Sequence, residues 1–199
     1  MIPPLTEAEQ SLETDRLRIT PLTLADTDIA LELLTDIRVM RYVTGEAETP
    51  EQVHAHMPDA VRKGAGGRIG IWTVSLKETG EKIGDTVILP LPVETEDTEW
   101  KTIVPDRYPD ASIETGYLLK PAHWGKGYAT EICARMLRFG FENTTLDAIY
   151  ATTDPDNAAS QNVLRKCGLV YLGERRAYAS DDVSWFRITR AEWETRRDA

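Results

Sequence analysis

A short stretch in the second half of the chain constrains the fold more than any other part of the 199-residue sequence. Residues 114–119, Glu-Thr-Gly-Tyr-Leu-Leu, have the composition of a β-strand, and a turn containing Gly125 and Gly127 follows them. An amphipathic helix begins directly after this turn. Glycines between a strand and a helix allow backbone N–H groups to converge at the helix N-terminus, where they can bind an anion. The sequence therefore predicts an anion site at this turn.

A second informative segment lies at residues 157–168, Asn-Ala-Ala-Ser-Gln-Asn-Val-Leu-Arg-Lys-Cys-Gly. Asn157 and Ser160 are three positions apart, so a helix places them on one face. Asn157 also suits a helix N-cap after the Asp-Pro-Asp sequence of residues 154–156. We therefore predict a short helix over residues 157–167, in which Asn157 serves as a cap, as a ligand-binding group, or as both.

Together, the turn and this second segment resemble the acyl-CoA site of the GNAT superfamily of N-acetyltransferases, in its branch that acetylates ribosomal-protein N-termini (RimJ/RimL-like). The family pattern is Gln or Arg, two residues, Gly, one residue, then Gly or Ala. It corresponds here to Trp124, Gly127 and Ala129, and Trp124 departs from it. Because main-chain N–H groups bind the pyrophosphate, we expect the site to tolerate this departure. A P-loop is excluded, because the Gly-Lys-[Ser/Thr] ending is missing.

The resemblance implies which residues bind the co-substrate acetyl-CoA. It assigns the pyrophosphate to the turn, whose members are Trp124, Gly125, Lys126, Gly127, Tyr128, Ala129 and Thr130. It implies that the backbone of Leu118 and Leu119 pairs with the pantetheine arm like an added strand, and that Asn157 hydrogen-bonds this arm. Ser160 then lies near the sulfur and helps the thiolate to leave. A tyrosine acid of a related branch corresponds to Leu164 here, so this chain lacks that acid.

Acetyl transfer requires a neutral amine, and Glu114 is the predicted general base. Strand alternation places Glu114 on one face with Ser112, Gly116 and Leu118. Desolvation beside an apolar strand raises a carboxyl pKa towards a useful value. Two alternatives remain: Glu114 binds the cationic amine while water carries the proton, or it is a solvent-facing strand residue.

Two considerations bear on the acceptor. Deprotonating a lysine of pKa about 10.4 at pH 7 costs about 4–5 kcal/mol, whereas a chain-terminal amine of pKa about 8 costs about 1 kcal/mol. The resemblance favours a protein or peptide N-terminus, while polyamines, amino acids and aminoglycosides stay open as small-molecule acceptors. Use of a longer acyl-CoA as the donor, in place of acetyl-CoA, is a further option. A non-catalytic acyl-CoA-binding sensor is the alternative from a different class.

Several other candidates have simpler explanations. Tyr117 and Tyr171 can replace the missing tyrosine acid, but both are typical packing residues. His54 and His56 in the second helix either line an acceptor groove or are ordinary surface residues. His123 lies beside the turn, where it caps or packs. Arg16 resembles a family arginine and is interpreted as structural.

Composition narrows the classes of function. A formal net charge of −10 argues against a broad nucleic-acid surface. No apolar run reaches the roughly 18–20 residues that cross a bilayer, and the N-terminus lacks the plan of a signal peptide. The two cysteines, Cys133 and Cys167, lie in predicted helices with apolar neighbours. We therefore expect a cytoplasmic protein with no membrane segment, no metal site and no disulfide framework.

The pattern along the chain predicts a flexible arm at residues 1–12 and one α+β domain at residues 13–199. A helix from Thr23 should carry Ile29, Leu33, Ile37 and Met40 on one face. A second helix should begin at Thr49, and Pro58 should kink or interrupt it. Strands are expected at residues 17–22, 69–76, 82–89, 112–119, 148–153, 169–177 and 183–189, and further helices at 127–142, 157–167 and from 191.

This order of elements predicts a mixed, mostly antiparallel twisted sheet with helices on both faces and a central β-α-β acyl-CoA-binding core. Residues 90–110 form an acidic, proline-rich loop that is either decoration or part of a substrate rim. The oligomeric state stays open, although a homodimer is common among relatives.

Overall fold

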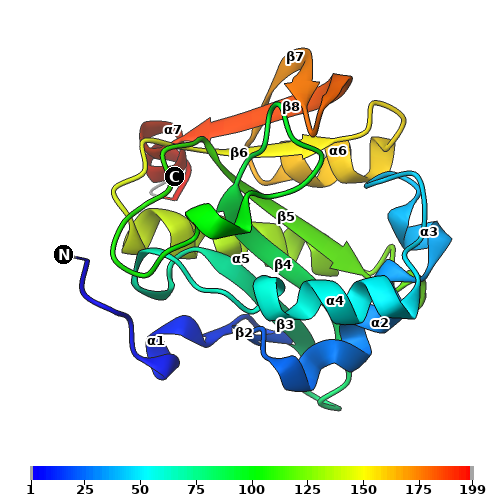
Figure 1. Ribbon diagram of the computed structural model, residues 1–199. Coiled ribbons are helices and arrows are strands. Elements are labelled where there is room, and N and C mark those ends of the chain that lie inside the picture. Colours follow the sequence, from blue (N-terminus) through cyan, green and yellow to red (C-terminus); the bar gives the residue numbers. More distant parts are fainter. Residues whose placement is uncertain (1, 198–199) are drawn as a thin grey trace.

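Eight strands form a single sheet with helices on both faces (Figure 1), in a computed structural model that describes residues 2–197. The strand order is β1-β2-β3-β4-β5-β6-β8-β7, and every neighbouring pair is antiparallel except β5 and β6. This arrangement confirms the predicted α+β class with a mostly antiparallel sheet and a β-α-β unit at its centre.

The strands are β1 (Leu12–Glu13), β2 (Leu17–Pro21), β3 (Gly70–Leu76), β4 (Lys82–Pro90), β5 (Ile113–Leu119), β6 (Ala148–Thr153), β7 (Val170–Ala177) and β8 (Ser180–Thr189). The helices are α1 (Glu7–Gln10), α2 (Thr27–Leu34), α3 (Ile37–Met40), α4 (Pro50–Ala60), α5 (Tyr128–Asn143), α6 (Ala158–Lys166) and α7 (Arg190–Arg197). Single turns of 3-10 helix occur at Leu24–Asp26, Ala65–Gly67, Trp100–Thr102 and Pro121–His123.

The predicted first helix is split into α2 and α3, which corrects the expectation of one continuous apolar face. Asp36 starts α3 as a new N-cap, because its Oδ1 accepts a hydrogen bond from the Arg38 N–H at 2.9 Å. Ile37 therefore leaves the shared face and is 51% exposed, whereas Ile29 and Leu33 are buried.

Helix α4 begins as predicted, with a capping box between Thr49 and Gln52. The Thr49 N–H donates to Gln52 Oε1 at 2.7 Å, and the Gln52 N–H donates to Thr49 Oγ1 at 3.3 Å. Pro58 does not interrupt α4, which continues to Ala60. A proline here removes the hydrogen bond that its own N–H would donate and crowds the carbonyl of His54, but only two helical residues follow it.

The largest core cluster lies between α5 and the sheet. Ile132, Met136 and Phe139 of α5 are buried there, and the Phe139 ring meets Trp72 of β3 edge-on with 5.4 Å between ring centroids. A separate cluster joins α2 to α4 through Ala30, Val53 and Met57, among others. Helices thus cover both faces of the sheet, and β5 lies between the two layers (Figure 1).

The N-terminal residues also contact the domain. The Trp72 indole N–H donates to the Gln10 carbonyl at 3.0 Å, and the Leu5 N–H donates to the Gly66 carbonyl at 2.8 Å. That residues 1–12 act as a flexible arm stays a prediction, and residue 1 lies outside the described part. Among residues 2–197, no helix is long and apolar enough to cross a membrane.

Candidate active site

The glycine-containing turn connects β5 to α5, as the sequence predicts. Gly125 and Gly127 have φ angles of +72° and +82°, in the left-handed region that favours glycine. Gly127 is the N-cap of α5. The N–H groups of Tyr128, Ala129 and Thr130 therefore belong to the first helical turn, where no carbonyl of the helix accepts their hydrogen bonds. This backbone geometry fits a pyrophosphate.

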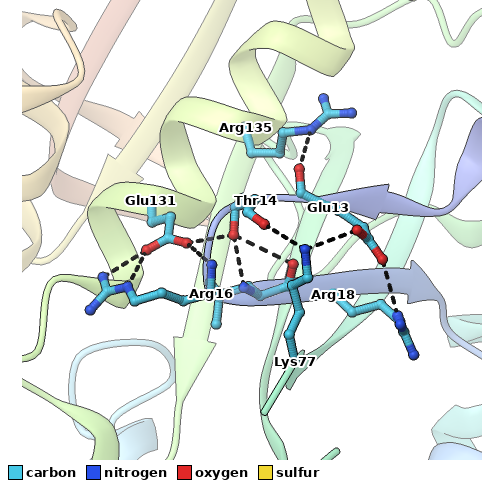
Figure 2. A network of polar contacts seen from close by, with 8 residues as sticks. Glu13, Thr14, Arg16, Arg18, Lys77, Glu131 and Arg135 are labelled. Atoms are coloured by element: carbon cyan, nitrogen blue, oxygen red, sulfur yellow. Dashed lines mark hydrogen bonds and ion pairs between the residues drawn. The ribbon is translucent and has the colours of Figure 1, made fainter.

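Arg16, from the connection between β1 and β2, contacts Glu131 of α5 (Figure 2) and also the turn before this helix. Its Nε donates to Glu131 Oε2 at 2.7 Å, and its Nη1 donates to the Lys126 carbonyl at 3.0 Å. The guanidinium also lies 4.4 Å from the centroid of the Tyr128 ring. Burial acts to raise the pKa of Glu131, but hydrogen bonds from Thr14 and Arg16 outweigh it and lower that pKa. These contacts agree with a structural role for Arg16.

The side chains beside the turn have structural partners. Trp124, 48% exposed, donates its indole N–H to the Leu119 carbonyl at 2.8 Å and so closes the end of β5. The Lys126 side chain is exposed at the rim. His123 is buried, and its Nε2 lies 3.1 Å from Glu81 Oε1, in agreement with packing.

A cavity of about 500 Å³ lies against the residues that precede the turn, and Glu114 is not part of its lining. It is lined by Glu32, Asp36, Arg38, Lys120, Pro121 and Ala122. Its two cations are paired within the chain: Arg38 with Asp36 at 2.6 Å, and Lys120 with Glu32 at 2.9 Å.

Strands β5 and β6 separate next to the residues that are predicted to pair with pantetheine. Within the described residues, β5 and β6 pair at one position, Glu114 with Tyr150, whereas β5 pairs with β4 along its full length. The edge of β5 beyond Glu114 therefore faces the gap between the two strands. Leu118 packs against the apolar cluster of α2 and α3, and Leu119 packs in the main core. Leu118 pairs with Asp85 of β4, and the Leu119 carbonyl accepts the Trp124 indole N–H, so the pantetheine pairing that the resemblance assigns to these two residues stays a prediction.

Glu114 is buried at this point of separation, with only 5% of its surface exposed. Thr152 of β6 donates a hydrogen bond to Glu114 Oε2 at 3.1 Å, and the Tyr178 hydroxyl donates to Oε1. Burial raises the pKa of Glu114 to about 7, although both hydrogen bonds act to lower it. The alternative of a solvent-facing Glu114 is therefore wrong.

Tyr178 is a site residue that the sequence analysis missed. It lies at the tip of the β7–β8 hairpin, where Tyr178 and Ala179 have φ angles of +52° and +55°. Their N–H groups donate to the Pro92 and Val93 carbonyls at 3.0 and 3.2 Å. The acidic loop thus supports the residue that contacts Glu114. A tyrosine in a strand connection carries no local signal of such a role.

Asn157 and Ser160 meet at the start of α6. Asn157 Oδ1 accepts a hydrogen bond from the Ser160 N–H at 3.1 Å, which confirms the N-cap interpretation. Ser160 Oγ lies 3.1 Å from the Tyr117 hydroxyl, and burial raises the pKa of Tyr117. Leu164, at the position of the tyrosine acid in a related branch, is 1% exposed and belongs to the core.

The candidate catalytic residues approach the β5 edge from opposite faces. Glu114 shares the Leu118 face, whereas Tyr117 points to the other face, where it contacts Ser160. Tyr171 is not part of this arrangement, since its ring packs on Phe186 with 5.3 Å between centroids.

The remaining sequence candidates are surface residues. His54 and His56 are exposed on α4, and His56 pairs with Glu48 at 3.1 Å. Among residues 2–197, no group of three or more His, Cys, Asp or Glu side chains is arranged to hold a metal ion.

Comparisons with known proteins identify the family. The model of the GNAT acetyltransferase domain matches residues 16–170. An uncharacterized Bacillus subtilis protein, YkkB, is 31% identical over 168 residues, which are 82% of this chain and 87% of that protein. The Aspergillus fumigatus FsC-acetyl coenzyme A-N(2)-transacetylase is also 31% identical, over 170 residues that cover 83% of this chain and 67% of that enzyme.

The fold likewise matches a solved structure. Spermidine N-acetyltransferase from Vibrio cholerae, in complex with CoA and spermine, superposes with a TM-score of 0.68 at 18% identity, covering 91% of this chain and 99% of that one. At this identity the likeness shows the fold alone. With the family match over residues 16–170, the chain belongs to the GNAT family and is an acetyl-CoA-dependent N-acetyltransferase.

Proposed function

We propose that the chain acetylates an α-amine, on a peptide N-terminus or an amino-acid-like molecule, by direct transfer with Glu114 as general base. The observation that carries this proposal is the environment of Glu114. It is a buried carboxyl at the separation of β5 from β6, and its pKa is raised to about 7. A base works best when its pKa is close to the operating pH.

The strength of this base favours an α-amine over a lysine-like amine. Transfer of a proton from an amine of pKa about 8 to a carboxylate of pKa about 7 is uphill by about 1.4 kcal/mol. The same transfer from an amine of pKa about 10.4 is uphill by about 4.6 kcal/mol. The Aspergillus fumigatus relative, whose name specifies N(2) as the acetylated nitrogen, supports the same choice.

The donor side of the proposal uses the turn, the edge of β5 and the start of α6. The turn of residues 124–130 binds the pyrophosphate through its N–H groups, and the edge at Leu118 and Leu119 pairs with pantetheine. Asn157 caps α6 through Oδ1, while its amide nitrogen is a separate donor for the pantetheine arm.

The chemical step then balances as follows. The amine nitrogen attacks the thioester carbon, and Glu114 takes the proton that the nitrogen loses. The C–S bond breaks, and the Ser160 hydroxyl, which the Tyr117 hydroxyl contacts at 3.1 Å, donates a hydrogen bond to the departing thiolate. The proton held by Glu114 then passes through solvent to the thiolate, which returns Glu114 to its carboxylate form. The products are an amide and CoA thiol.

The proposal also bears on the ribosomal-protein branch, on the other acceptor classes and on the sensor alternative. The ribosomal-protein branch is one specific form of the N-terminal acceptor. Polyamines and aminoglycosides are the alternative acceptor classes, and their amines need a stronger base unless a neighbouring charge lowers their pKa. The sensor alternative loses support, because the chain belongs to a family of acetyltransferases.

The test is release of CoA thiol from acetyl-CoA by the purified protein with a panel of acceptors. The panel contains N-terminal peptides, N-terminally blocked peptides with a free lysine, amino acids, spermidine and an aminoglycoside. We expect release with free α-amines and a loss of about 10²–10⁴-fold in kcat for Glu114→Gln. Glu174→Gln, at an exposed carboxylate of β7, is the matched control. Turnover with spermidine alone, or an unchanged kcat for Glu114→Gln, would contradict the proposal.

A further inference from the structure

Two thiols meet where α5 packs against the end of α6. Cys133 is fully buried in α5, and Cys167 is the partly exposed C-cap residue of α6. Both belong to one apolar cluster. The Cys167 thiol donates to the carbonyl of Thr130 at 3.5 Å, and Thr130 precedes Cys133 by one helical turn. The Cys167 sulfur therefore lies against the turn of α5 that carries Cys133.

The surroundings make the two thiols chemically different. A hydrogen bond with Cys133 lowers the pKa of Cys167 against the effect of burial, and the charges of Arg196 and Lys166 act in the same direction. The same thiol–thiol interaction, together with complete burial, raises the pKa of Cys133. Cys167 is thus the thiol that forms a thiolate more readily, and the thiolate is the nucleophile in disulfide exchange.

A surface cavity of about 420 Å³ lies next to Cys167 in sequence, since Gly168 is part of its wall. Its lining consists of Gly168, Val170, Ala191, Glu192, Thr195 and Arg196. The Arg196 guanidinium crowds Gly168, where a Cβ atom would stand 2.5 Å from Arg196 Nε. A partly exposed, low-pKa cysteine beside a second thiol is typical of redox-sensing sites.

We propose that Cys133 and Cys167 are a redox pair that forms an intramolecular disulfide with a low-molecular-weight disulfide as the oxidant. The Cys167 thiolate attacks one sulfur of that disulfide, forms a mixed disulfide and releases one thiolate. Cys133 then loses its proton, attacks the Cys167 sulfur and releases the second thiol. The two protein thiols lose two electrons and two protons, and the oxidant is reduced to two thiols.

The pair also lies beneath the proposed sulfur end of the acetyl-CoA site. Both cysteines are close enough to Tyr117 to act on the pKa of its hydroxyl, and this hydroxyl contacts Ser160. A disulfide would tie the first half of α5, which follows the turn, to the C-terminal end of α6. We therefore infer that oxidation changes the affinity for acetyl-CoA. This second part of the inference rests on the proposed function, whereas disulfide formation does not.

The test incubates the folded, full-length protein with glutathione disulfide and counts thiols by alkylation and intact mass. The wild type is expected to lose two thiols and two hydrogen atoms without gaining glutathione, and dithiothreitol should restore both thiols. Cys133→Ser should stop at one glutathione on Cys167, and Cys167→Ser should stay unmodified. Cys133→Ala should give the same result as Cys133→Ser, and circular dichroism checks that the variants are folded.

The outcomes separate the two parts of the inference. A wild type that keeps both thiols, retains glutathione or forms only intermolecular disulfides would overturn the redox pair. If the disulfide forms, calorimetric titration with acetyl-CoA should show a change in Kd of at least about fivefold, reversed by dithiothreitol. An unchanged Kd would overturn the coupling. Failure of the wild type to bind acetyl-CoA in either redox state would count against the proposed function instead.

Discussion

The Tyr178 hydroxyl donates a hydrogen bond to the carboxylate of Glu114, 64 positions away in the sequence. Tyr178 reaches this carboxylate from a hairpin tip with a positive φ angle, a conformation that costs about 1–2 kcal/mol for a residue with a Cβ atom. Bonds from the tip to the Pro92 and Val93 carbonyls hold it there. Because burial raises the pKa of Glu114 and this hydrogen bond lowers it, Tyr178, together with Thr152, limits how far that pKa rises.

Replacing Tyr178 by phenylalanine should therefore shift the pH dependence of the reaction. Loss of a hydrogen bond to a charged group is worth about 1.5–3 kcal/mol, which raises the pKa of Glu114 by about one unit or more. The acidic limb of the kcat/KM profile should move to higher pH by this amount. Tyr171→Phe, at an exposed tyrosine on the neighbouring part of the hairpin, is the control and should leave the limb unchanged. An acidic limb at the wild-type pH in Tyr178→Phe would show that this bond does not tune the base.

Glu114 should also make folding stability depend on pH. Its pKa is about 7 in the folded protein and 4.5 ordinarily, so between these values the folded state binds more protons than the unfolded state. The free energy of unfolding then falls as the pH rises through this window. The upper bound is 2.5 pKa units at 1.36 kcal/mol each, or about 3 kcal/mol. Glu114→Gln cannot titrate, so its stability relative to wild type should increase from pH 4.5 to pH 7.5.

Urea unfolding at both pH values measures this difference. Glu174→Gln serves again as the control, because removal of this exposed carboxylate should change the free energy of unfolding equally at the two pH values. A difference between Glu114→Gln and wild type that does not change with pH would mean that Glu114 is not buried with a raised pKa.

Gly127→Ala should weaken acetyl-CoA binding more than its effect on stability explains. The positive φ of Gly127 makes alanine cost about 1–2 kcal/mol, although the nearest neighbour of the added Cβ, Arg16 Nη2, stands at an ordinary 3.5 Å. Gly80→Ala is a matched control, since Gly80 has a φ angle of +72° in the β3–β4 turn with open space around it. Both variants should lose similar stability in thermal unfolding. Only Gly127→Ala should raise the Kd for acetyl-CoA, and equal Kd values would remove the turn from the binding site.

Arg16→Ala should raise the Kd for acetyl-CoA with little change in the KM for the amine. Arg16 joins the Lys126 carbonyl to Glu131 and so holds the turn, and it is not among the hydrogen-bond partners of Glu114. Its side chain is 46% exposed, so the effect on global stability should be small. Arg18→Ala is the control. Arg18 lies two residues after Arg16 and forms an exposed ion pair with Glu13. If both variants bind acetyl-CoA equally, Arg16 does not organise the turn.

Much of the fold and the local geometry of the candidate donor site were predictable, because both depend on residues close together in the chain. The turn at Gly125 and Gly127 is a local backbone property, and so are the N-cap at Asn157 and the capping box at Thr49. Strand alternation placed Glu114 and Leu118 on one face. These features need only neighbours within a few residues, which a sequence displays directly.

The departures arose where a local preference competed with another contact. Asp36 capped a new helix and turned Ile37 to solvent, which hydrophobic spacing alone did not predict. Pro58 was tolerated inside α4 close to its end.

The tertiary structure alone decided the acceptor side. The pKa of Glu114 depends on burial and on Thr152 and Tyr178, which come from two other parts of the sheet. The proximity of Cys133 to Cys167 likewise results from the packing of α5 against α6. By itself, the sequence determined that a strand, a glycine turn and a helix follow one another, with free N–H groups at the start of the helix. Which side chains surround the base was decided by packing, because desolvation and long-range hydrogen bonds exist only once the sheet has formed.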